Sequence, residues 1–304
     1  MCKTFVGFCR LRCSAAEIGF TKSPFQLDIH LQWGGDTGTI GLIIVLLAVI
    51  AAIFANVLAP YSPYEQHIDQ SLQGPSARHW LGQDDLGRDI LSRIMYGTRI
   101  SLMVGFITVS ISAIFGMLVG ALSGYLGGWI DEILMRITDI LLAFPGILLA
   151  IAIMAILGPS LNNVIIALCI VGWKSYARLV RGEILKEKEQ EYVQAARALG
   201  YSKTRTIIFH LVPNTLNPVI VMSTLGIASM IISEAGLSFL GLGTQPPIPS
   251  WGAMLAEGRQ YLLQAYQLTT FPGLAIMILV LGFSFLGDAL RDALDPHIKI
   301  LKDF

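Results

Sequence analysis

One stretch of the sequence has side chains that could coordinate a metal ion. His79, Asp84, Asp85 and Asp89 lie close together, and carboxylate oxygens are the ligands that Ca²⁺ prefers. The same stretch is polar and contains Gly87, which is typical of a turn in a solvated loop. We therefore favour a solvated turn over a metal site and predict that this chain holds no metal.

Motifs of several enzyme classes are missing. The sequence contains no GxxxxGK[ST] loop for nucleotide phosphates, no HExxH and no GxSxG. No Ser/His/Asp set suggests a protease. We therefore predict a chain that is not an enzyme, does not hydrolyse ATP itself and carries no cofactor.

Two carboxylates and a proline interrupt long apolar runs at Glu234, Asp139 and Pro145. A carboxylate at the centre of a bilayer costs about 2.5–3.5 kcal/mol on insertion scales, so Glu234 must face protein or a water-filled cavity. These three residues are our candidates for a pore or gate. The alternatives are a structural hydrogen bond for Glu234, which we favour, and an Asp139 that snorkels or pairs with Arg136. Pro145 is expected to kink its helix and free a carbonyl.

The composition indicates a membrane protein. Of 304 residues, 54% are hydrophobic and 14% are charged, against roughly 25% charged residues in soluble domains. A net charge of zero predicts no nucleic-acid partner. Cys2, Cys9 and Cys13 lack the spacing of a metal site, so neither zinc nor a disulfide is expected there.

Six segments are long and apolar enough to span a bilayer as helices. The second and fifth are rich in small residues, which predicts that they lie inside the helix bundle. The fold class is therefore all-α, with about six transmembrane helices. The expected spans are residues 40–58, 100–123, 133–157, 164–180, 218–240 and 271–290.

The basic residues predict the orientation. A cytoplasmic N-terminus places sixteen of the 21 Lys and Arg residues on the cytoplasmic side and five outside, as the positive-inside rule requires. Both termini are therefore expected in the cytoplasm. The predicted segments are a cytoplasmic N-terminal segment 1–38, a first transmembrane helix 39–58, an external loop 59–99, a membrane core 100–290 with a cytoplasmic loop 181–217, and a cytoplasmic tail 291–304.

The cytoplasmic loop contains EYVQAARALGYSKTRTIIFHLVP, residues 191–213. Good helix formers are followed by Gly200, which favours a left-handed helix end. Ser202 can cap a second helix, which Pro213 would end or bend. Val193, Ala196 and Gly200 fall on one face, where small residues would fit a groove in another protein. The alternative is an amphipathic helix that rests on lipid headgroups.

This loop resembles the EAA loop of binding-protein-dependent ABC importers. The matching residues are Gln194, Ala195, Ala196, Gly200, Ile208 and the run from Leu211 to Pro213, with Gln194 in place of the usual Glu. The resemblance implies a coupling helix that docks on an ATP-binding subunit. The implied coupling residues are Gln194, Ala195, Ala196, Arg197, Gly200 and Pro213.

Further motifs resemble the dipeptide/oligopeptide/nickel permease family, and within it the second, C-type subunit. They are HWLGQDDLGRDILSR, DILLAFP, SEAGLSFLGLG, PIPSWGAML and GDALRDALDP, within residues 56–299; the first 38 residues match poorly. The resemblance implies the type I permease fold of ABC importers. It also places Asp84, Gly87, Arg88, Asp89 and Trp251 on the external face, which meets a solute-binding protein or closes the outer gate.

The function that follows is that of a permease subunit in the cytoplasmic (inner) membrane. The implied partners are membrane lipid, a homologous permease, ATP-binding subunits that hold ATP and Mg²⁺, and an extracytoplasmic solute-binding protein. Di- and oligopeptides are the expected solute, with nickel, glutathione and sugars left open. A secondary transporter or channel would instead predict inverted repeats with several membrane carboxylates, which we do not find. An intramembrane enzyme is disfavoured by the missing motifs.

Overall fold

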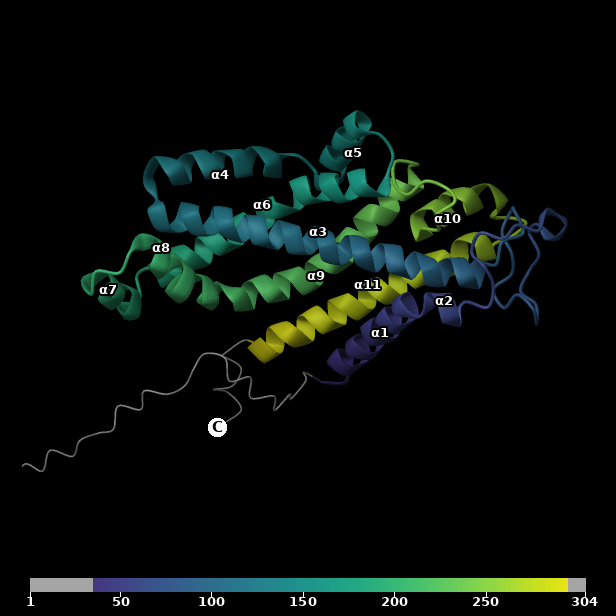
Figure 1. The fold of residues 1–304 in the computed structure, drawn as a ribbon, viewed down its shortest axis with the longest axis horizontal. Helices are drawn as coiled ribbons and strands as arrows, with labels where there is room; N and C mark the ends of the chain where they lie inside the picture. The colour runs from purple at the N-terminus through teal and green to yellow at the C-terminus, as the bar shows by residue number, and fades with distance from the viewer. Residues whose placement is uncertain (1–34, 295–304) are drawn as a thin grey trace, which may run out of the picture. The chain divides into compact units, whose positions relative to one another are not determined.

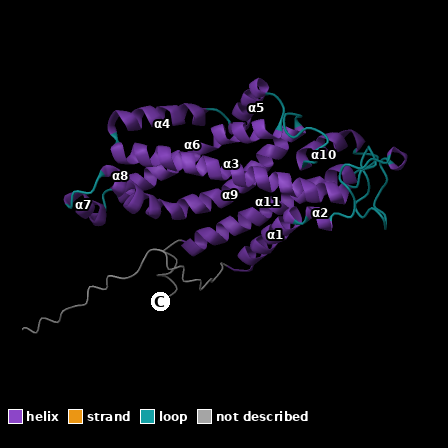
Figure 2. Ribbon diagram, in the orientation of Figure 1, coloured by secondary structure: helices purple, strands orange, loops and turns teal. Residues whose placement is uncertain are grey.

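A computed structural model of the chain describes residues 35–294. The three N-terminal cysteines, most of the predicted N-terminal segment and most of the predicted tail lie outside the described residues. Within the described range, helices joined by loops make up the fold, without a named strand (Figure 2). The elements are α1 Gly35–Ile53, α2 Ala55–Leu58, η1 Ile68–Gln70, α3 Ile90–Leu126, α4 Gly128–Ala143, α5 Gly146–Leu157, α6 Leu161–Glu187, α7 Glu191–Ala198, α8 Lys203–Thr206, the π-helical η2 Ile207–Leu211, α9 Val212–Phe239, α10 Trp251–Gly258, η3 Arg259–Tyr261 and α11 Gln267–Leu294.

The number and type of the predicted membrane spans are confirmed. Five helical runs are long and apolar enough to cross a membrane, and the pair α4 and α5 makes a sixth if it is taken as one broken span. Each predicted span coincides with one of these, so the fold is an all-α membrane fold. α8, η2 and α9 form one continuous helical run over Lys203–Phe239.

Several predicted boundaries are wrong, because helices continue past the apolar segments. α3 begins at Ile90, so the predicted external loop 59–99 ends ten residues early. The carboxylate of Asp89 caps this helix by accepting a hydrogen bond from the Ser92 amide at 2.8 Å. The predicted cytoplasmic loop 181–217 is mostly helical, because α6 runs on to Glu187. α11 likewise extends to Leu294, into the predicted tail.

The third predicted span is broken rather than kinked. α4 and α5 meet at 93° across Phe144 and Pro145. Phe144 is extended, with φ −92° and ψ 136°, as expected for a residue that precedes proline. Proline also lacks the N–H that would continue α4. The sequence therefore located the interruption correctly and underestimated its angle.

The connecting segments lie at the two opposite ends of the long helices. In Figure 1, α7 and α8 lie at one end of α3 and α9, whereas α10 and the loop between α2 and α3 lie at the other end. The predicted cytoplasmic and external loops are thus at opposite ends, as alternating spans require. Each end holds predicted functional residues.

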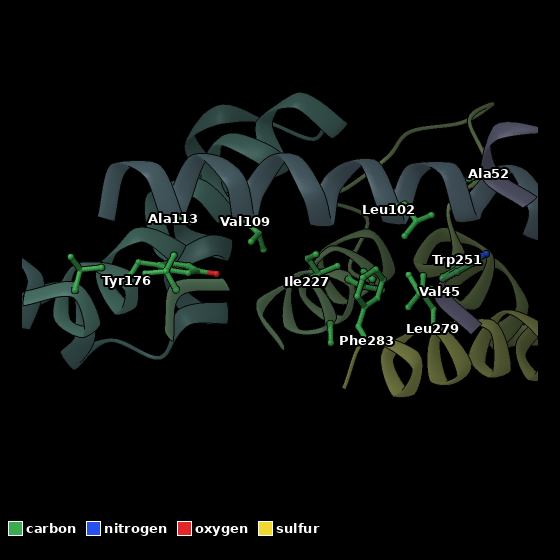
Figure 3. Close-up of a cluster of buried hydrophobic side chains, with 14 of the residues drawn as sticks. Val45, Ala52, Leu102, Val109, Ala113, Tyr176, Ile227, Trp251, Leu279 and Phe283 are labelled. Carbon is green, nitrogen blue, oxygen red and sulfur yellow. The ribbon is translucent and has the colours of Figure 1, made fainter. Parts of the chain in front are cut away.

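The interior of the bundle lies between α3, α6, α9 and α11. Val109, Tyr176, Ile227 and Phe283, one from each helix, belong to one buried apolar cluster (Figure 3). In the most apolar 18-residue stretch of each helix, 50% of α3 and 50% of α6 is buried. The corresponding share is 28% for the run Lys203–Phe239, which contains α9. The prediction of an interior position is therefore confirmed for α3, while within the described chain α6 is more buried than α9.

Close approach of α3 and α6 depends on glycine. A Cβ atom added to Gly120 would lie 2.5 Å from the Ala177 carbonyl oxygen and 2.9 Å from Val180 Cβ. Gly116 and Gly124 face α6 in the same way. Small residues at this spacing allow helix backbones to pack closely in lipid.

Gly120→Ala is expected to destabilise the protein by about 1–3 kcal/mol, because the added methyl group forces α3 and α6 apart. The matched control is Gly182→Ala on α6, where an added Cβ meets no atom within 4 Å. There the same change should be neutral or stabilising by up to about 1 kcal/mol. Thermal unfolding midpoints in detergent report both effects. Equal midpoints for the two variants would contradict the close packing.

Candidate functional site

The predicted coupling segment forms a helix, a glycine turn and a second helix. α7 ends at Ala198, and Gly200 adopts φ +78°, which L side chains rarely tolerate. The Tyr201 amide donates to the Ala196 carbonyl at 3.1 Å and closes the turn. Ser202 then caps α8 by accepting from the Arg205 amide at 3.3 Å. The predicted left-handed turn and the predicted cap are both confirmed.

Pro213 neither ends nor begins this second helix. The helical run continues through Pro213 to Phe239. Immediately before it, η2 is π-helical, and the Val212 amide bonds to the Ile207 carbonyl five residues earlier. A π turn is a common place for a helix to bend, so it accommodates a residue without an amide hydrogen. Of the two predicted outcomes, termination is wrong.

The predicted docking face of α7 is wrong, because this chain covers it itself. Val193 and Ala196 are buried, and Val193 belongs to the chain's own apolar cluster. The exposed face carries Gln194, Ala195 and, directly after the last residue of the helix, Leu199, which is 73% exposed. Gly200 is also exposed. A partner protein would therefore meet the face opposite to the one that the small-residue spacing suggested.

Tyr192 ties α7 to the two neighbouring spans. Its phenol donates to the Glu187 carboxylate at 2.6 Å and accepts from the Asn214 side-chain amide at 2.7 Å. Partial burial, and then the bond to Glu187, raise the pKa of Tyr192 to about 12. The phenol therefore keeps its proton, and both hydrogen bonds, throughout the physiological pH range. The sequence offered no signal for this contact, since it joins residues up to 22 positions apart.

At the opposite end, Asp84, Gly87, Arg88 and Asp89 form a tight turn that precedes α3. The Gly87 amide donates to the Asp84 carbonyl at 3.0 Å, and Gly87 has φ +72°. A Cβ at Gly87 would lie 1.9 Å from the His67 carbonyl oxygen, so only glycine fits. The predicted turn at Gly87 is confirmed.

The prediction that this turn is solvated is wrong, because its charges form a buried ion-pair cluster. The Asp84 carboxylate accepts from Arg88 Nε at 2.6 Å and also pairs with Arg93. Glu257 of α10 accepts from Arg88 at 3.0 Å and from Arg93 at 3.2 Å. The cluster joins the turn, α3 and α10. Charges buried in this way are stable only when paired and hydrogen-bonded.

The carboxylates that suggested a metal site separate into two groups. Asp89 accepts from His79 Nδ1 at 2.9 Å and caps α3. Asp84, Asp85 and Glu257 come close enough to share an ion. Two guanidinium groups, however, already contact this second group. These cations supply the charge that a metal would otherwise supply.

Trp251 is buried at the start of α10 and is not an interfacial aromatic. Its indole N–H donates to the Ile94 carbonyl at 3.0 Å, and its ring lies against Gly97 of α3. Together with Glu257, Trp251 therefore fastens α10 to the first two turns of α3. The predicted external residues thus join the turn, α3 and α10 at this end of the bundle.

The break at Pro145 frees a carbonyl, as predicted, and the structure identifies its partner. The Leu141 carbonyl, four residues before Pro145, accepts a hydrogen bond from Lys174 Nζ at 2.8 Å. Lys174 lies on α6 and is buried, although it is one of the sixteen basic residues counted on the cytoplasmic side. No local sequence pattern indicated this contact, because the two residues lie 33 positions apart.

Asp139 pairs with Arg178 of α6 instead of Arg136. More than half of each side chain is exposed, so the pair adds little to stability. Glu234 is fully buried, and one of its carboxylate oxygens accepts from Ser238 at 2.7 Å. Its surroundings within this chain are thus protein, as its cost in a bilayer requires. Roles in a pore or gate remain predictions for Glu234, Asp139 and Pro145.

Solved structures show which class of protein has this fold. The inward-facing MetNI methionine ABC transporter aligns with a TM-score of 0.56, covering 68% of this chain and 98% of that chain at 20% identity. An amino acid ABC transporter crystallised with histidines aligns with a TM-score of 0.52 at 14% identity, covering 67% of this chain and 94% of that one. The fold is that of an ABC importer permease.

Family comparisons then identify the family. The model described as "Binding-protein-dependent transport system inner membrane component" matches residues 116–300, and "N-terminal TM domain of oligopeptide transport permease C" matches residues 37–75. The chain belongs to the family of binding-protein-dependent transport inner membrane components. The second match shows that the resemblance begins with the first helix, well before residue 56.

Curated relatives cover almost the whole chain. The dipeptide transport system permease protein DppC of Alkalihalophilus pseudofirmus is 51% identical over 277 residues, 91% of each chain. The glutathione transport system permease protein GsiD of Pectobacterium atrosepticum is 48% identical over 257 residues, 84% of this chain and 85% of that one. The chain is therefore a multi-pass membrane permease of ABC-type transport and not a secondary transporter or channel.

Proposed function

We propose that this chain is one of two permease subunits of an importer for short peptides. The curated relatives support this solute, because one is named for dipeptides and another for glutathione, itself a short peptide. The second permease would be a homologue of this chain, and peptide would pass between the two. Nickel and sugars find no support among these relatives.

The observation that carries the proposal is the exposed face of α7. Helix α7 projects at one end of the long helices (Figure 1) and presents Ala195 and Leu199 outward, while Val193 fastens it to its own chain. An ATP-binding subunit would dock on this exposed face, in the manner of a short helix in a groove. ATP and Mg²⁺ would bind to that subunit, and this chain would hold no cofactor.

The orientation follows from the same assignment. An ATP-binding subunit works in the cytoplasm, so α7 and both termini would lie on the cytoplasmic side. The end of the bundle that Asp84, Arg88, Arg93, Glu257 and Trp251 hold together would then lie outside, on the side of the solute-binding protein. ATP binding would shift the permease pair between two packed arrangements, one open to each side, by changing the separation of the docked helices.

Reconstitution tests the proposal. The chain would be assembled in vesicles with its partner permease, its two ATP-binding subunits and its solute-binding protein, and uptake of labelled dipeptide and of glutathione would be followed. We expect uptake that requires ATP on the cytoplasmic side and binding protein on the other. Uptake without ATP, or ATP-driven uptake of nickel or a sugar with neither peptide taken up, would overturn the proposal.

A further inference from the structure

A pocket of about 260 Å³ lies between α5, α6 and α9, directly beside the break at Pro145. Its lining is mostly apolar or hydroxyl-bearing, and Lys174 is the one charged residue in it. The polar lining residues are Lys174, Ser175, Tyr176, Ser229 and Ser233. A pocket with one buried cation and several hydroxyl groups selects an anionic group with neighbouring polar atoms.

The charge of Lys174 is not balanced within the described chain. Only 6% of the residue is exposed, and its ammonium group donates to one neutral acceptor, the Leu141 carbonyl. Among residues 35–294, no carboxylate lies within ion-pair distance of it. An ammonium ion has three N–H donors, so two remain for another partner. A buried, unpaired ammonium is costly, and such a residue in a membrane span marks a ligand pathway.

The first turn of α5 adds to the positive potential of this pocket. Gly146 and Ile147 line it, and no side chain caps α5 at Pro145. The free amides at a helix N-terminus favour an anion. Broken membrane helices place such N-termini beside anionic substrate groups. The helix end and Lys174 therefore favour the same kind of ligand, and they come from different segments of the chain.

The serines of α9 supply acceptors. Ser233 Oγ donates to the Ser229 carbonyl at 2.8 Å, and Ser229 Oγ to the Leu225 carbonyl at 3.5 Å. With their protons directed to the helix backbone, these hydroxyl oxygens keep lone pairs for a ligand's N–H group. A peptide terminus offers both groups, a carboxylate and an adjacent amide N–H.

We propose that this pocket binds the C-terminal carboxylate of the transported peptide through Lys174 and the N-terminus of α5. The inference rests on the proposed function, since it names a contact within that transport path. The competing occupant of the Lys174 ammonium is an acidic side chain of the partner permease. A carboxylate of the partner permease would pair with Lys174 in the same way whether the peptide ended in a carboxylate or in an amide. Changing the peptide's C-terminus therefore distinguishes the two possible partners of Lys174.

The test compares a dipeptide with its C-terminal amide in the reconstituted importer. The initial uptake rate of each substrate by the Lys174→Met importer is divided by the wild-type rate for the same substrate, with binding protein at saturation. This ratio removes any preference of the binding protein for one of the two substrates. We expect uptake of the free dipeptide to fall about tenfold, as for loss of a hydrogen bond to a charged group. Uptake of the amide should change less than about twofold.

Two further variants keep the test decisive. Lys174→Gln retains a donor without the charge and gives the same contrast if Lys174→Met fails to assemble. Lys186→Met, at an exposed site in the last turn of α6, removes a lysine away from the pocket and should leave both rates unchanged.

Three outcomes would overturn the inference. An equal fall for both substrates would assign Lys174 to the Leu141 carbonyl or to the partner permease. Unchanged uptake rates for both substrates would show that Lys174 has no role in uptake. If the wild-type importer takes up neither peptide form, the proposed function fails and the inference fails with it, whereas the first two outcomes leave that function standing.

Discussion

Asp84→Leu is expected to destabilise the protein by about 3–5 kcal/mol, the range for breaking a buried ion pair by removing one partner. The Asp84 carboxylate accepts from Arg88 Nε, from Arg93 and from the amides of Leu86 and Arg88. Without it, the two buried guanidinium groups keep only Glu257 and, for Arg88, the more distant Asp85 at 3.6 Å. The loop, α3 and α10 would lose their common contact. Thermal unfolding in detergent measures the effect.

The matched control for this prediction is Asp69→Leu in the same loop. Asp69 is exposed, so its replacement should change stability by no more than about 0.5 kcal/mol. Asp84→Asn separates the effect of charge from that of shape, because it keeps the size of the side chain. Its loss of stability should lie between those of the other two variants. If Asp84→Leu unfolded at the same temperature as Asp69→Leu, the cluster would not hold this end of the bundle together.

Leu199→Glu is expected to reduce recovery of the ATP-binding subunit with the permease by about tenfold or more, the loss typical of a central interface residue. Leu199 is 73% exposed on the free face of α7, so the change leaves the folded permease intact. In a docked complex, however, the new carboxylate would be buried without a partner. Co-purification after co-expression of the subunits measures the loss.

The control for the docking prediction is Leu263→Glu. Leu263 is fully exposed and lies in the segment after α10, at the other end of the bundle, so the same substitution there should leave co-purification unchanged. Gly200 is a poorer probe of docking. Its φ of +78° strains any residue with a side chain, so a substitution there would unfold the turn itself. Full recovery of the ATP-binding subunit with Leu199→Glu would show that this face of α7 is not the docking surface.

Hydropathy predicted where the spans lie but not where the helices end. Apolar segments end where charged residues begin, yet α3 continues through Arg93 and Arg99, and α6 through Arg181. These charges are tolerated because each has a partner from another segment, such as Asp131 for Arg181 at 2.6 Å. Local composition cannot show that a distant carboxylate will be present, so these boundaries could not be predicted.

The candidate sites show the same division between local and tertiary information. The Gly200 turn, the Ser202 cap and the interruption at Pro145 follow from local chemistry, and the sequence predicted all three. Helical periodicity correctly placed Val193 and Ala196 on one face of α7. It could not show that the chain itself covers that face, because this depends on the bundle behind it.

The two hydrogen bonds of Tyr192 have a mechanical consequence. They connect α7 to the end of α6 and the start of α9, and these two helices form two of the three walls around Lys174. The third wall, α5, is separated from its own preceding helix by a right-angled break. A force applied to α7 would therefore reach α6 and α9 together, so nucleotide binding to a docked ATP-binding subunit would change the width of the pocket that Lys174 lines.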